Sequence, residues 1–206
     1  MRDYMKDLIN VYERVSKKFG NSCELEQVLK KIISLHKVGV LNINHSVLEL
    51  ITAGYLINEG YKVYVEVEMA GGVADLYAIK GIDLVIEVET GYVPPNNAVD
   101  AEEFLMGRLA LKTARYSNVA HGFYIAVPSF YIPPIPSELL LKPDERNEEE
   151  NRRIMSLIRR YTKAPDITLS DVKNSKIDGI ITINSKELEL KLIDVRSFQH
   201  LKEFYG

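Results

Sequence analysis

Three acidic residues lie in two neighbouring segments that are rich in apolar side chains. Asp75 lies in the segment 73–79, and Glu87 and Glu89 lie in the segment 83–89. The alternation of side chains predicts two strands, so Glu87 and Glu89 share one face, about 6.6 Å apart along the strand. Carboxylates at this spacing repel one another unless a cation lies between them, and hard divalent cations prefer oxygen ligands. The pattern therefore indicates a metal site.

The turn between the two strands decides whether Asp75 joins the other two acids. With an odd number of residues in the turn, such as 80–82, Asp75 pairs with Glu87, and cross-strand partners share a face. An even number would pair Asp75 with Ile86 and place the acids on opposite faces of the sheet. We expect the odd register, in which three carboxylates converge.

The same triplet, Glu-Val-Glu, also occurs at 66–68. Alternating acids in a strand usually form a solvated face, and we predict this for the copy at 66–68. The copy at 87–89 follows the apolar residues Val85 and Ile86 and the strand that carries Asp75. Acids embedded in so apolar a strand cost free energy unless they have partners. The copy at 87–89 is therefore the candidate site.

Helices and strands must position these acids. The sequence predicts helices at 1–19, 24–37 (with a stop at Gly39), 44–58 (ending at Gly60), 98–116 and 145–162, and strands at 61–69, 73–79, 83–89, 121–127, 178–183 and 187–195. Three consecutive strands, a crossover helix and a fourth strand give a mixed sheet, with the fourth strand parallel to the third. We expect an α/β core with this sheet at its centre.

Composition is that of an ordinary globular protein. The 206 residues are 46% hydrophobic and 27% charged, with a net charge of -3. A protein that only coats nucleic acid is usually basic, so this class is not expected. A single cysteine, Cys23, indicates a reducing compartment, and no apolar run has the length of a signal peptide or a membrane span. We therefore expect a cytoplasmic protein without a membrane partner.

The order helix, three strands, helix, strand, with acids on the second and third strands, resembles the core of the PD-(D/E)XK nuclease superfamily over about residues 44–127. The matching residues are Glu49 on the first helix of this core, Asp75 and Glu87. The resemblance implies a restriction-endonuclease-like αβββαβ fold, with a central mixed β-sheet flanked by helices. It also implies a Mg²⁺-dependent or Mn²⁺-dependent nuclease acting on DNA. Its metal ligands would be Asp75, Glu87, Glu49 and the main-chain carbonyl of Val88.

One position departs from the family pattern, since Glu89 stands where the family has lysine. RecB-like members carry Gln-x-x-x-Tyr on the next helix, and Lys112 and Tyr116 have this spacing, with lysine in place of glutamine. We expect Lys112 to supply the missing ammonium group. The alternative is a surface lysine near a helix end, where the helix dipole favours it. The candidate catalytic residues are Asp75, Glu87, Glu89, Lys112 and Glu49.

Basic residues on the same helix predict a contact with phosphate. Arg108, Lys112 and Arg115 fall at i, i+4 and i+7 and form one stripe, which is equally typical of a solvated face. The candidate nucleic-acid-binding residues are Arg108, Lys112, Arg115, Tyr116 and His45. Glu49 has an alternative of its own, because it lies three residues after Ser46 and the pair fits a helix capping box.

The chain divides into an N-terminal helical segment, 1–40, packed on the core, and a nuclease-like α/β domain, 41–206. The core of this domain spans 44–127, and its C-terminal helix and strands span 145–195. The loop at 128–147 exposes apolar residues to no obvious core: Phe130, Tyr131, Ile132, Ile135 and Leu139–Leu141. We expect a homodimer through this loop, with the strands within 178–195; the alternative is a loop folded back over its own sheet.

Two functions of other classes stay open beside the nuclease. Glu89 at the lysine position fits a nuclease-like fold that has lost catalysis and binds DNA or a partner protein. Alternatively, the acids are surface residues of a structural protein. If Asp75, Glu87 and Glu89 converge, the structural protein with surface acids is disfavoured; the active and the inactive nuclease-like fold both stay open.

Overall fold

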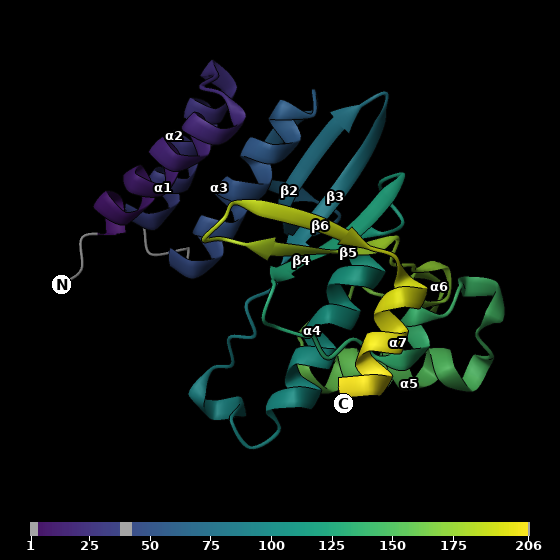
Figure 1. Ribbon diagram of the computed structural model, residues 1–206. Helices are drawn as coiled ribbons and strands as arrows, with labels where there is room; N and C mark the ends of the chain where they lie inside the picture. Colours follow the sequence, from purple (N-terminus) through teal and green to yellow (C-terminus); the bar gives the residue numbers. More distant parts are fainter. Residues whose placement is uncertain (1–3, 38–42, 206) are drawn as a thin grey trace.

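A computed structural model describes residues 4–37 and 43–205 of the chain. Six strands form one mixed sheet in the order β1 to β6, with helices on both faces (Figure 1). The strands are β1 (Lys62–Met69), β2 (Gly72–Lys80), β3 (Ile82–Val88), β4 (Gly122–Pro128), β5 (Gly179–Asn184) and β6 (Glu189–Ile193). The helices are α1 (Tyr4–Phe19), α2 (Cys23–Lys37), α3 (Ile43–Asn58), α4 (Ala101–Tyr116), α5 (Glu148–Tyr161), α6 (Leu169–Asn174) and α7 (Val195–Tyr205), with short 3-10 helices η1 (Pro95–Asn97), η2 (Ser137–Leu140) and η3 (Pro143–Glu145). None of the helices in these ranges has the length and apolar character needed to cross a membrane.

The first four strands pair in the predicted order. Strands β1, β2 and β3 form an antiparallel meander, β3, β4 and β5 pair in parallel, and β6 returns antiparallel to β5. The predicted crossover through α4 is confirmed, because β4 is parallel to β3. Ile79 pairs with Asp83, which is the predicted odd register. Continued along the strands, this register places Asp75 opposite Glu87.

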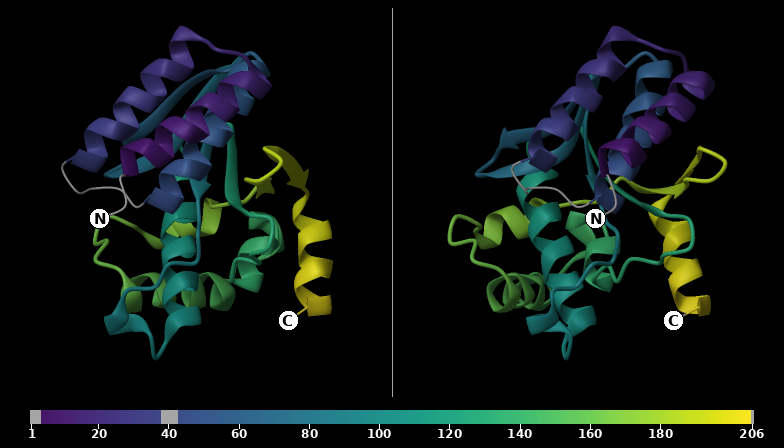
Figure 2. Two further views of the ribbon diagram at one scale, coloured as in Figure 1. Left: turned by 60° about the vertical axis from the view of Figure 1, so that its left-hand side comes forward. Right: turned by 90° about the vertical axis from the view of Figure 1, so that its left-hand side faces the viewer.

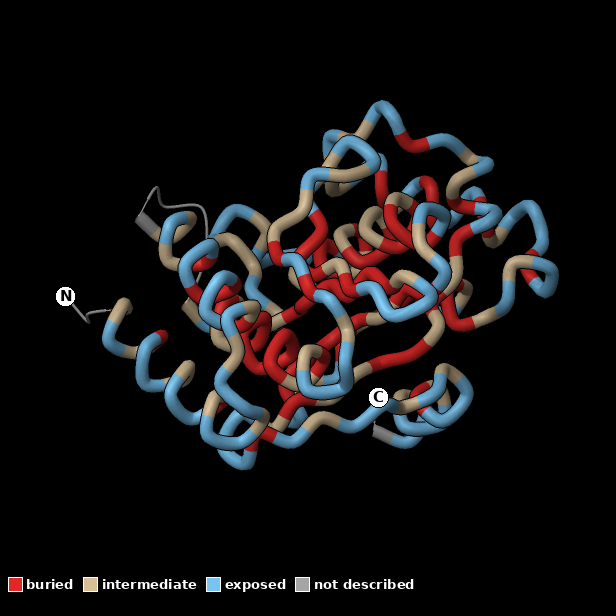
Figure 3. Tube along the Cα trace, turned by 90° about the horizontal axis from the view of Figure 1, so that it is seen from above, coloured by how far each residue is buried: buried red, intermediate tan, exposed pale blue. Residues whose placement is uncertain are grey.

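Two hydrophobic cores lie on opposite faces of the sheet. Helices α1, α2 and α3 cover the face that carries Leu76 and Ile86, and α4, α5 and α7 cover the face that carries Val85 and Phe123 (Figure 2). Buried residues follow the strands and the inner sides of the helices (Figure 3). Because side chains alternate along β3, Glu87 lies on the same face as Val85 and points toward α4.

The C-terminal part of the chain differs from the prediction. Helices α6 and α7 were not predicted, and the expected strand at 187–195 ends at Ile193. The carboxylate of Asp194 accepts hydrogen bonds from the backbone N of Ser197 (3.0 Å) and from its hydroxyl (2.6 Å), and so begins α7. The alternation that predicts a strand here continues to Val195 and hides this start. At the other end, Gly39 and residues 1–3 of the first predicted helix lie outside the described residues, as does the predicted boundary at 40.

The loop at 128–147 folds back onto its own domain. Ile135, Leu139 and Leu140 are buried in the core beneath α4 and α5, so the prediction that they are exposed is wrong. They are buried because η2 packs against α5 and α7. Phe130 and Ile132 are 89% and 45% exposed. Tyr131 and Leu141 are partly buried. The homodimer stays a prediction, and Phe130 and Ile132 are the exposed side chains of the loop that support it.

Asp83, at the start of β3, ties three strands together. Its carboxylate accepts hydrogen bonds from Tyr77 Oη on β2 (2.8 Å) and from the backbone N of His121 (3.0 Å), which precedes β4. It also contacts the His121 ring. The hydrogen bonds from the ring and backbone of His121 and from Tyr77 lower the pKa of Asp83 to about 2. The ionised form is therefore the one that the folded state favours.

We predict that Asp83→Asn lowers the free energy of unfolding by about 1 kcal/mol at pH 7. A carboxyl group with a lowered folded pKa contributes stability above its unfolded pKa, and this contribution is lost as the pH falls through the folded pKa. The difference between wild type and variant should therefore shrink between pH 4 and about 2. Urea unfolding at pH 7 and at low pH measures it. An equal loss at both pH values would contradict the role of the ionised carboxylate.

Candidate metal centre

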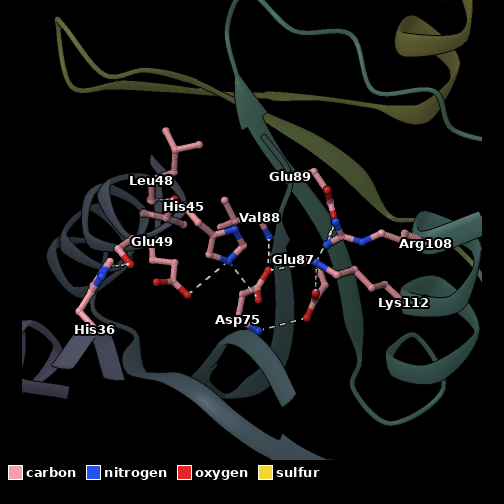
Figure 4. Close-up of polar contacts among 12 residues, drawn as sticks. His36, His45, Leu48, Glu49, Asp75, Glu87, Val88, Glu89, Arg108 and Lys112 are labelled. Atoms are coloured by element: carbon pink, nitrogen blue, oxygen red, sulfur yellow. Dashed lines mark hydrogen bonds and ion pairs between the residues drawn. The ribbon is translucent and has the colours of Figure 1, made fainter. Parts of the chain in front are cut away.

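Helix α3 presents one acid to the inside of the molecule. Glu49 is completely buried, and within residues 4–37 and 43–205 no N–H or hydroxyl group donates a hydrogen bond to either of its carboxylate oxygens. His45 lies one turn earlier, with its Nε2 atom 3.6 Å from Glu49 Oε1 and 3.2 Å from Asp75 Oδ1 (Figure 4). The capping-box alternative for Glu49 is wrong, because Ser46 lies inside α3 and its hydroxyl contacts His36 Nε2 at 2.9 Å.

The side chains of Asp75 and Glu87 bind the backbone where the β2–β3 ladder ends. Asp75 Oδ2 accepts a hydrogen bond from the amide of Val88 (2.7 Å), and Glu87 Oε1 accepts one from the amide of Asp75 (3.1 Å). The last paired residues of the ladder are Leu76 and Ile86. Beyond this pair the two acids take over the amides of the opposite strand, which fixes the position of both carboxylates (Figure 4).

Lys112 on α4 brings the three predicted acids together. Its Nζ atom lies 2.8 Å from Glu87 Oε2, 2.8 Å from Glu89 Oε1 and 3.4 Å from Asp75 Oδ2. Its side chain is only 16% exposed, so the alternative of a surface lysine is wrong. Burial opposes the charged ammonium, but Asp75, Glu87 and Glu89 outweigh this and raise the pKa of Lys112 well above its ordinary value.

Glu66 belongs to the same cluster, and the prediction of a solvated face is wrong for this residue. The pairs Val65–Leu76 and Val67–Ala74 flank it in the β1–β2 ladder, so Glu66 lies opposite Asp75. Ligand atoms of His45, Glu49, Glu66 and Asp75 all lie within 4.8 Å of one another. The signal was available in the sequence, because a turn at Ala70 and Gly71 pairs Met69 with Gly72 and fixes this register.

The acids of the cluster differ sharply in charge. Burial alone would raise the pKa of Asp75, but the charges of Lys112 and His45 and the hydrogen bond from Val88 lower it below its ordinary value. Burial, and then repulsion by Asp75, raises the pKa of Glu49 and of Glu87 well above the ordinary value. Burial also raises the pKa of Glu66. Asp75 is thus the ionised centre of a group that resists further negative charge.

The other predicted binding residues lie around this centre in different ways. Arg108 has its Nη2 atom 3.7 Å from Glu89 Oε1, at the edge of the cluster. Arg115 points away from it and pairs with Asp166 at 2.8 Å. Tyr116 is 3% exposed and packs in the core, and burial raises the pKa of its hydroxyl to about 12. Such burial argues against direct contact of Tyr116 with nucleic acid.

Comparisons of the chain with protein-family models, with curated proteins and with solved structures found no significant match. The chemistry of the centre is therefore inferred from its own residues.

We predict that Lys112→Met destabilises the protein by about 3–5 kcal/mol near pH 8, because it leaves buried carboxylates without their cation. These acids would protonate more readily as the pH falls, so the loss should be smaller at pH 5. Urea unfolding of both proteins at the two pH values tests this. The control is Lys30→Met, which removes an exposed lysine paired with Glu26 and should leave the free energy of unfolding nearly unchanged, because solvent screens an exposed ion pair. Similar losses in the two variants would contradict the buried cluster.

Proposed function

We propose that the chain is a metal-dependent nuclease with a restriction-endonuclease-like core, which hydrolyses phosphodiester bonds in DNA. The observation that carries this proposal is the convergence of Asp75, Glu87 and Glu89 on Lys112, at the place where β2 and β3 separate. The order α3, β1, β2, β3, α4, β4 supports it, because this is the arrangement expected for the PD-(D/E)XK core.

The residues present suit a divalent cation such as Mg²⁺ or Mn²⁺. Glu49 has two buried oxygens without a hydrogen-bond donor, and an unpaired buried carboxylate is costly unless a cation or a proton neutralises it. Asp75, Glu87, Glu49 and the carbonyl of Val88 would hold the metal in the manner of the family. A bound divalent cation would polarise a phosphoryl oxygen and lower the pKa of a coordinated water.

Basic side chains of α4 would bind the phosphate. Because Glu89 stands at the lysine position of the family, the positive charge comes from α4, through Lys112. Its ammonium, fixed by Glu87 and Glu89 at 2.8 Å each, would stabilise the negative charge that develops on the phosphate as water attacks phosphorus and the bond to the leaving oxygen breaks. Arg108, a third exposed in its side chain, would contact a neighbouring phosphate of the strand.

A catalytically inactive nuclease-like fold that binds DNA or a protein is the second candidate. The observation in its favour is the pairing of Lys112 with three carboxylates. An ammonium so firmly neutralised has less charge to offer a phosphate. The two candidates differ in whether the bond is cut, which a cleavage assay decides.

We predict cleavage of DNA that requires Mg²⁺ or Mn²⁺ and that falls on the order of 10²-fold or more in Asp75→Asn and in Glu87→Gln. Both substitutions keep the size of the side chain, and circular dichroism would verify the fold. The matched control is Asp144→Asn at an exposed acid in η3, which should cleave like wild type. Substrates should include duplex, flap, junction and single-stranded DNA. Binding without cleavage of any of them would favour the inactive fold.

A further inference from the structure

The acids of the centre fall into two groups, one beside an ammonium group and one beside an imidazole. Glu87 and Glu89 lie against Lys112. Glu49 and Glu66 lie on the other side of Asp75, where the nearest basic group is the imidazole of His45. Glu49 is fully buried there, and no N–H or hydroxyl group of the described residues donates a hydrogen bond to its oxygens. A buried carboxyl group in this position needs either a proton or a cation to neutralise it, and a bound metal ion would supply the cation.

Asp75 links the two groups through its two oxygens. Oδ2 accepts the Val88 amide at 2.7 Å and lies 3.4 Å from the Lys112 ammonium, whereas Oδ1 faces His45 at 3.2 Å. The carboxylate is therefore held by the Val88 amide and Lys112 on the α4 side, and it faces His45 on the side of α3 and β1. A cation on the side of α3 and β1 would meet one oxygen each from Asp75, Glu49 and Glu66 and one imidazole nitrogen, all within 4.8 Å of one another.

We propose that His45, Glu49, Glu66 and Asp75 form one divalent-cation site that prefers a transition-metal ion of the Mn²⁺ type to Mg²⁺. This inference rests on the proposed nuclease, in which the ion would activate water. Asp75 and Glu49 belong to the ligand set of the family pattern, and His45 and Glu66 extend that set on the side of α3 and β1. Mg²⁺ usually keeps several waters and takes one or two carboxylates. Three carboxylates and an imidazole form a more complete set of ligands, and imidazole nitrogen favours transition ions.

Glu66 is the ligand that the family pattern does not supply. It has a positive φ of 50° in the middle of β1, a conformation that is costly for a residue other than glycine. The neighbouring acid on the same strand, Glu68, is exposed and lies outside the group of ligands. Two acids two residues apart thus have different surroundings, which makes Glu68 a matched control for Glu66.

The test is Mn²⁺ binding to the full chain without nucleic acid, measured by electron paramagnetic resonance and by calorimetry. Wild type should bind one Mn²⁺, and Mg²⁺ should compete only in large excess. Glu66→Gln should weaken Mn²⁺ binding by about tenfold or more, and Glu68→Gln should leave it unchanged. His45→Gln should bring the affinities for Mn²⁺ and Mg²⁺ closer together. Thermal unfolding of each variant would verify that the fold is retained.

Equal Mn²⁺ affinity in Glu66→Gln and Glu68→Gln would overturn the role of Glu66. Equal affinity of wild type for Mg²⁺ and Mn²⁺ would overturn the preference. Neither result would contradict the nuclease proposal, which the cleavage assay tests separately. Cleavage with Mg²⁺ that depends on Asp75 and Glu87 requires no contribution from Glu66. Conversely, Mn²⁺ binding that depends on Glu66, in a protein that cuts none of the DNA substrates, would support the metal site and contradict the proposed nuclease activity.

Discussion

Repulsion among buried carboxylates is the constraint on which the centre depends. Asp75 lies between Glu66 on β1 and Glu87 on β3, with Glu49 reaching it from α3. In a medium of low dielectric such acids cannot all be ionised without positive charge beside them. Lys112 supplies that charge from α4, on one face of the sheet, while His45 approaches from α3, which packs on the other face. The helices on both faces of the sheet therefore contact the carboxylate of Asp75.

The same constraint explains why the two strands separate where they do. The β2–β3 ladder is regular up to Leu76 and Ile86, and the carboxylates of Asp75 and Glu87 then replace backbone carbonyls as acceptors. The exchange keeps the amides of Asp75 and Val88 paired at the place where side chains from α3, β1, β2, β3 and α4 meet. If the proposed metal binds here, the stability lost to this repulsion would be the cost of a prearranged set of ligands, as in other functional centres.

Local patterns predicted much of this arrangement. The odd turn between β2 and β3 was enough to place Asp75 with Glu87, since register follows from turn length and side-chain alternation. The spacing of Lys112 on the next helix led to the correct partner. Glu66 was missed because alternating acids on an edge strand are the ordinary sign of a solvated face. Only the registers of the β1–β2 and β2–β3 pairs taken together place Glu66, Asp75 and Glu87 in one row across the sheet.

Long-range packing was beyond the reach of such patterns. Ile135, Leu139 and Leu140 fall in a proline-rich loop without helical or strand period, and their burial depends on α5 and α7. The start of α7 depends on a single side chain, Asp194, which interrupts an otherwise regular strand pattern. Tyr116 matches a family spacing but lies within the core, because its side of α4 faces the sheet. Of these elements the sequence predicts α4 but not η2 or α7, and tertiary contacts decide which residues are covered.

The central claim is that Asp75 is the carboxylate around which a divalent cation binds. Crystals grown or soaked with Mn²⁺ and measured at a wavelength where manganese scatters anomalously test it most directly. We predict an anomalous peak in contact with Asp75, on the side of α3 and β1. Manganese peaks found only at other acids on the surface, with the group around Asp75 unchanged, would contradict the claim.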